Sequence, residues 1–126
     1  MHCVSETHAF RRSAESLGLS EDEYFRLVTY LSENPDAGDL IPGTGGARKL
    51  RFAPLGGGKR GGYRVVTYYC AEDIPVFLMD VYAKGERATL SKGEKNELRQ
   101  ILASFADDYR AMTKRKVLEI RAEVAS

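Results

Sequence analysis

Cysteines are scarce in this sequence, and long apolar runs are missing. The 126 residues include only two cysteines, Cys3 and Cys70, which without a secretory signal indicate reduced thiols rather than a disulfide framework. Residues 1–10 lack the apolar stretch of a signal peptide. No apolar run approaches the ~20 residues that span a bilayer. The sequence therefore predicts a cytoplasmic protein that makes no membrane contact.

The ligand spacing of a metal site is also missing. His2, Cys3 and His8 lie near one another, but at an N-terminus that we expect to be mobile. No other group of histidines, cysteines or carboxylates has the spacing of a metal site. We therefore expect neither a metal nor a cofactor.

Acidic residues are missing from the middle of the chain, although the net charge of the whole is only +1. Residues 1–39 hold three basic and eight acidic side chains, a sum of −5, and residues 72–126 hold ten of each. Residues 40–71 hold six basic side chains and no acidic one, a sum of +6. Such a block predicts a partner that bears phosphates, although the charges could also serve only to keep a sheet soluble. The six are Arg48, Lys49, Arg51, Lys59, Arg60 and Arg64.

Length and composition fit one folded α+β domain that spans residues 1–126, because 43% of the residues are hydrophobic and 29% are charged. Two short helices open this domain. Thr7 is placed to cap the first helix, and Gly18 ends it. Ser20 begins the second helix with the spacing of a capping box, and Asn34, which precedes a proline, ends it.

Three short runs rich in β-branched and aromatic residues follow, at Ala47–Ala53, Tyr63–Cys70 and Pro75–Ala83. Turn residues separate them, and the glycine-rich connection between the first two runs carries Lys59 and Arg60. Such runs predict a twisted antiparallel sheet of three to four strands.

A long helix closes the chain. Ser91 and Glu94 have the capping-box spacing, and no glycine or proline interrupts residues 94–126. The sequence therefore predicts one helix of roughly 30 residues, about 45 Å long at 1.5 Å per residue. A domain of this size cannot bury all of that helix. The apolar positions of its extension, residues 106–126, need a partner, unless the extension is a solvated tail.

Strand alternation places several cations on one face of the expected sheet. Lys49 and Arg51 point away from the two large apolar residues of their strand. In the last strand the odd-numbered positions from 77 to 83 are apolar, which puts Tyr82 on the opposite face. Each cation alone would be an ordinary exposed strand residue. Together they predict a cationic surface, formed by Lys49, Arg51, Arg64 and Lys84.

The phrases GTGGARKLRF (residues 43–52) and GKRGGYRVV (residues 58–66), followed by a Leu-Ser-Lys-Gly-Glu helix start at 90–94, carry a family resemblance. They resemble the RelE/ParE toxin superfamily, and most closely its HigB-type branch. The resemblance implies a RelE-like fold with two N-terminal helices, a twisted antiparallel sheet and a C-terminal helix. It also implies a toxin that an antitoxin holds inactive and that, once released, cleaves mRNA in the ribosomal A site without a metal.

The resemblance also assigns roles to residues. Cleavage by the RNA 2′-hydroxyl requires removing its proton, stabilising charge on the phosphate and protonating the leaving oxygen. A guanidinium suits the phosphate because it is a planar, permanently charged fork. The implied catalytic residues are Lys49, Arg51, Arg64 and Lys84. The expected RNA-binding residues are Arg48, Lys59, Arg60 and Arg87. The candidates for an acid or base are Tyr82 and Glu86.

Two alternative functions stay open at this point. ParE-type relatives poison DNA gyrase by protein binding instead of cutting RNA, but they lack the sheet cations. A degenerate homologue would act only in complex with its antitoxin. The partners that the resemblance implies are mRNA, the ribosome and an antitoxin of the helix-turn-helix type, with operator DNA reached only through the antitoxin complex. The extension at residues 106–126 is expected to bind either that antitoxin or a second copy of the chain.

Overall fold

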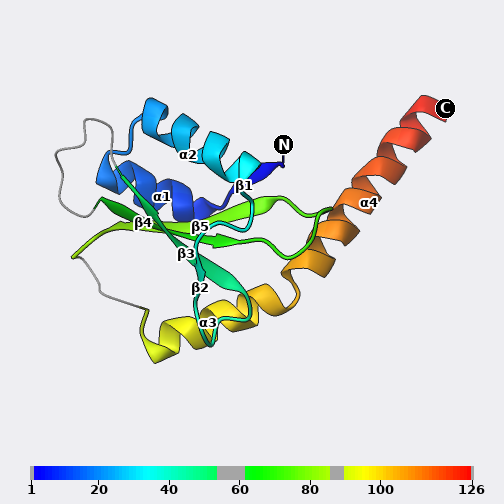
Figure 1. Cartoon of the computed structure of the whole chain (residues 1–126). Coiled ribbons are helices and arrows are strands. Elements are labelled where there is room, and N and C mark those ends of the chain that lie inside the picture. The colour runs from blue at the N-terminus through cyan, green and yellow to red at the C-terminus, as the bar shows by residue number, and fades with distance from the viewer. Residues whose placement is uncertain (1, 54–61, 86–89, 126) are drawn as a thin grey trace.

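A five-stranded sheet lies at the centre of the computed structural model, with helices on both of its faces (Figure 1). The structure describes residues 2–53, 62–85 and 90–125. Within these ranges, none of the helices combines the length and apolarity needed to cross a membrane. The elements are, in chain order, β1 (Val4–Glu6), α1 (His8–Leu17), α2 (Glu21–Glu33), β2 (Asp39–Leu40), β3 (Ala47–Phe52), β4 (Tyr63–Tyr68), β5 (Val76–Ala83), α3 (Lys92–Ala103) and α4 (Phe105–Ala125).

The sheet is mixed, with the strand order β1-β5-β4-β3-β2. Strands β2 to β5 pair antiparallel with their neighbours, as expected, whereas β1 pairs parallel with β5. The α+β class and the RelE-like order of helices and strands are confirmed. The expected count of three to four antiparallel strands was wrong, because β1 has three residues and β2 has two. Such short segments carry no readable alternation.

The N-terminus is part of the sheet, and the expectation of a mobile terminus was therefore wrong. Val4 pairs with Val76, and the Val76 N–H donates to the carbonyl oxygen of Cys3 at 2.8 Å. His2 Nε2 lies 2.7 Å from the carbonyl oxygen of Ile74, and its ring meets Tyr69 edge-on at 4.8 Å. Within the described ranges, no three His, Cys, Asp or Glu side chains are grouped as a metal site would require.

Local capping signals fix both N-terminal helices where the sequence predicts them. The Thr7 hydroxyl accepts the Phe10 N–H, and Gly18 ends α1 in the left-handed conformation at φ 72°. Both bonds of the capping box between Ser20 and Glu23 are present at the start of α2. These caps direct the apolar stripes of both helices onto one face of the sheet. The buried residues of that first core cluster are Phe10, Leu27, Leu31, Phe52, Val65, Val76, Leu78 and Val81.

A β-bulge changes the phase of β5. Val66 pairs with Asp80 and Thr67 with Leu78, so Met79 is an extra residue opposite this register shift. As a result, Phe77 packs in the cluster under α3, while Val81 packs in the cluster under α1 and α2. The expectation of one uninterrupted apolar face from 77 to 83 was therefore wrong. The alternation beyond the bulge, which places Tyr82 opposite Val81, is unaffected.

The C-terminal helix is broken at Ser104, and the expectation of one helix of roughly 30 residues was wrong. Ser104 has a non-helical backbone at φ −114° and ψ 2°. The change of direction allows the first turn of α4 to stay on the sheet, where Phe77 contacts Phe105 at 4.5 Å and Tyr109 at 5.7 Å between ring centroids. Tertiary packing therefore overrides an uninterrupted helical sequence. Beyond this contact, α4 projects away from the sheet (Figure 1).

An ion pair fixes the first part of α4. Arg110 donates from Nε and Nη2 to the two carboxylate oxygens of Asp73, at 2.7 and 2.8 Å. The same contact lowers the pKa of Asp73 and raises that of Arg110. Every residue from Ala111 to Ala125 is exposed. The packed part of the C-terminal segment therefore reaches Arg110, and not only Phe105.

Truncation after Ala111 is expected to leave the free energy of unfolding within about 0.5 kcal/mol of the full chain, because only exposed residues are lost. Truncation after Ala103, which also removes Phe105 and Tyr109, should lower it clearly. Urea unfolding followed by circular dichroism measures both. A large loss of unfolding free energy in the chain that ends at Ala111 would mean that the distal part of α4 packs on the domain in solution.

Candidate nucleic-acid interface

Antiparallel pairing brings cations from three strands to one end of the sheet. Arg51 of β3 pairs with Arg64 of β4, and Arg64 pairs with Tyr82 of β5. Directly paired residues point to the same face, so the three side chains form one row across the sheet. Lys49 precedes Arg51 by two positions, and Lys84 follows Tyr82 by two, which places them on this face as well. We call Lys49, Arg51, Arg64 and Lys84 the cation row.

The cation row is open to solvent but anchored to the sheet. Arg51 and Lys84 are exposed, while Lys49 and Arg64 are half-buried. Arg64 Nη1 donates to the carbonyl oxygen of Tyr63 at 3.4 Å. The backbone N–H of Lys84 donates to the carbonyl oxygen of Gly62 at 3.0 Å, which extends the β4–β5 pairing to the edge of the row.

The pairing of Arg51 with Arg64 is unfavourable for folding. Like charges directly opposite each other in an antiparallel pair destabilise the sheet, where opposite charges would stabilise it by about 0.2–1 kcal/mol. A local feature that opposes stability is typical of a functional site. The paired arginines therefore suit the binding of a negatively charged ligand better than they suit the stability of the sheet.

The other expected site residues are not part of the cation row. Arg48 is on the opposite face of β3 from Lys49, and its Nη1 donates to the carbonyl oxygen of Gly38 at 3.0 Å. Tyr82 shares the face of the cation row, but it is 3% exposed and packs in the core cluster on that face. The remaining expected residues, Lys59, Arg60, Glu86 and Arg87, lie outside the described residues.

A family model described as the RelE toxin of the RelE/RelB toxin–antitoxin system matches residues 3–123, from before β1 almost to the end of α4. The chain belongs to the RelE toxin family. The resemblance seen in the sequence to this superfamily is thus confirmed. As a toxin of a toxin–antitoxin system, the protein has an antitoxin as its implied partner. Among solved structures, a mutant of the E. coli toxin RelE in the free state is similar at a TM-score of 0.46 and 17% identity, over 68% of this chain and 85% of that one.

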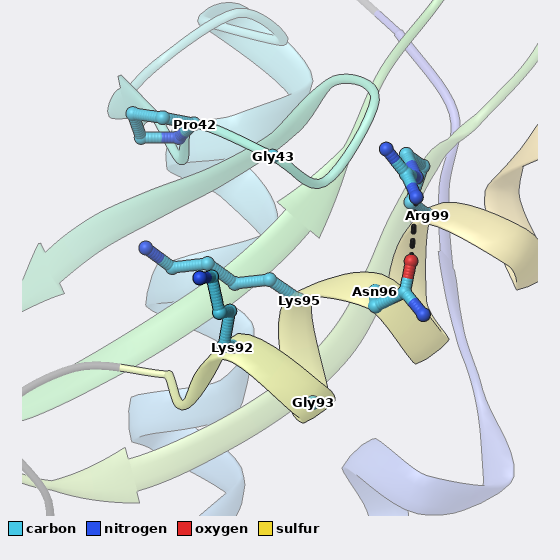
Figure 2. Close-up of a pocket in the computed structure, with 7 residues that line it drawn as sticks. All are labelled: Pro42, Gly43, Lys92, Gly93, Lys95, Asn96 and Arg99. Carbon is cyan, nitrogen blue, oxygen red and sulfur yellow. Dashed lines mark hydrogen bonds between the residues drawn. The ribbon is translucent and has the colours of Figure 1, made fainter.

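This RelE-family toxin has a second cationic group that the sequence reasoning missed. Lys92, Lys95 and Arg99 of α3 face the turn between β2 and β3 across an open cleft of about 690 Å³ (Figure 2). The spacing of the three cations, at i, i+3 and i+7, was the available signal, because it puts them on one side of a helix. The cleft is also lined by Pro42, Gly43, Gly93 and Asn96.

Proposed function

We propose that this toxin is a HigB-type endoribonuclease that cleaves mRNA on the ribosome, without a metal, and so stops translation in the cytoplasm. The observation that carries the proposal is the cation row, in which two arginines are paired on an open sheet face with a lysine on either side. A surface of this kind matches a phosphodiester that gains charge during cleavage.

The chemistry divides among the members of the row. The Arg64 guanidinium, anchored at the sheet, binds the scissile phosphate and stabilises its added charge as the 2′-hydroxyl attacks. Arg51, its direct neighbour, supplies a second guanidinium to the same phosphate. Lys49 and Lys84 flank the pair and exchange protons with the attacking and leaving oxygens.

Partners follow from the same proposal. The toxin acts on mRNA held by the ribosome, and an antitoxin of the helix-turn-helix type keeps it inactive and links it to operator DNA. Family membership supports the antitoxin, and the cation row supports the RNA.

Expression without an antitoxin is expected to produce new 5′ ends within a reporter mRNA, and growth should stop as translation fails. Primer extension before and after induction measures these ends directly. A variant that lacks the charge of Arg64 serves as the control and should leave the transcript whole. Growth arrest with intact transcripts would contradict the nuclease function and favour gyrase binding.

A further inference from the structure

The cleft beside α3 is built from a glycine turn and three lysine or arginine stems. A Cβ added to Gly45 would lie 3.4 Å from Arg99 Cγ, and one added to Gly43 would lie 3.8 Å from Lys95 Cδ. Both glycines have positive φ angles, 78° and 84°. The bare backbone of the turn therefore rests near the aliphatic stems and leaves the charged ends free for a ligand.

The charged ends have no acidic partner in the part of the chain that the structure describes. Arg11 pairs with Glu6 and Arg110 with Asp73, but no carboxylate of residues 2–53, 62–85 and 90–125 lies within ion-pair distance of Lys92, Lys95 or Arg99. Arg99 Nη2 donates instead to Asn96 Oδ1 at 2.5 Å, which orients the guanidinium (Figure 2). Three positive charges around one cleft, with no ion-pair partner among the described residues, favour an anionic ligand.

The shape of the charge distribution favours a chain of anions over a single one. At 1.5 Å per residue, Lys95 and Arg99 lie about 4.5 and 10.5 Å along the helix axis from Lys92. The turn that walls the cleft leads directly into β3, which carries Lys49 and Arg51. From Gly46 to Arg51 the strand spans about 17 Å at 3.4 Å per residue. One extended nucleic-acid strand therefore reaches both cationic groups.

We propose that the cleft of Lys92, Lys95 and Arg99 binds backbone phosphates of single-stranded RNA at a distance from the cleaved bond. It sets the affinity and the position of the strand, while the cation row carries out cleavage. The proposal takes the identity of the nucleic acid from the proposed ribonuclease function, but it concerns a separate set of residues. An acidic protein segment is the competing occupant.

Salt-dependent binding of a fluorescein-labelled, 2′-O-methyl RNA, which cannot be cleaved, tests this inference. The full chain is compared with the variant K92Q/K95Q/R99Q and with K114Q/R115Q/K116Q, which removes the same charge from the exposed part of α4. Each phosphate contact contributes about 0.7 to the slope of log affinity against log salt for single strands. Between about 50 and 200 mM salt, the magnitude of this slope should be smaller by about 2 for the cleft variant than for the full chain. The α4 variant should keep the slope of the full chain.

Additional variants keep the test decisive. Lys92→Gln alone removes a cation that does not touch the glycine turn. It should reduce the magnitude of the slope by about 0.7. On ribosomes, the cleft variant should need more substrate but keep its cleavage rate at saturation. Cleft-dependent binding by a wild-type chain that cleaves no RNA would support this inference and contradict the proposed nuclease.

Three results would overturn the inference. Equal losses in the cleft and α4 variants would show that RNA binding depends only on net charge. Absence of RNA binding by the wild-type chain would show that the cleft is not a phosphate site. Normal RNA binding by the cleft variant, together with lost affinity for an acidic antitoxin segment, would assign the cleft to a protein partner.

Discussion

Arg64→Ala is expected to lower the rate of mRNA cleavage at saturating substrate about 100- to 1,000-fold, the usual effect of removing one donor that stabilises charge in a transition state. Arg64 is the central member of the cation row, since Arg51 pairs with it on one side and Tyr82 on the other. Its loss removes the guanidinium that the proposed mechanism places on the scissile phosphate. The fold should persist, because the substitution also relieves repulsion from Arg51.

Three variants separate the contribution of the Arg64 charge from that of its planar shape and from the effect of losing any surface cation. Single-turnover cleavage on programmed ribosomes gives the rate, and thermal unfolding checks the fold. Arg64→Lys keeps the charge but loses the planar fork, so it should bind the ribosome like the wild type and cleave more slowly. Lys114→Ala, an exposed cation on α4, should change neither quantity. If Arg64→Ala cleaved mRNA at the wild-type rate, the cation row would have no part in the mechanism.

Phe77→Ala is expected to destabilise the protein by about 3–5 kcal/mol, the range for deleting a buried aromatic side chain. Phe77 is 6% exposed, and its ring contacts both Phe105 and Tyr109. The substitution would leave a cavity at the point where α4 joins the sheet. The first turn of α4 should consequently lose its order before the rest of the domain unfolds.

Two measurements check this result. Urea unfolding gives the free energy, and hydrogen exchange shows whether amides near Phe105 lose protection. Met112→Ala is the matched control, because Met112 lies on the same helix but is 56% exposed. A loss below about 1 kcal/mol for Phe77→Ala, the typical effect of any point mutation, would show that the contact of α4 with the sheet is weak.

Local signals made much of this fold predictable. Thr7, Ser20 and Ser91 each cap a helix through a backbone N–H three residues away, so the sequence alone contains both partners. The cation row was predictable for a similar reason. Alternation within one strand places Lys49 and Arg51 on the same face, and the β3–β4 register then adds Arg64.

The features that could not be predicted depend on contacts between distant segments. The extra residue at Met79 is defined only by the pairing of β5 with β4. The break at Ser104 exists because aromatic side chains after it pack on Phe77, and nothing in the local sequence disfavours a continuous helix. The α3 cleft requires knowing that the turn near Gly43 lies beside Lys95. Sequence periodicity contains none of this information.

Because β1 pairs only with β5, the first strand of the chain must wait for the last one during protein synthesis. Val4 emerges from the ribosome 72 positions before its partner Val76. At about 5–20 residues per second, β1 therefore waits roughly 4–14 s before it can pair. An affinity tag attached ahead of β1 would be close in sequence to this late-pairing edge strand. Strand β1 pairs with β5, which leads to Lys84. A tag placed after the exposed end of α4 avoids that edge and suits purification of the active toxin better.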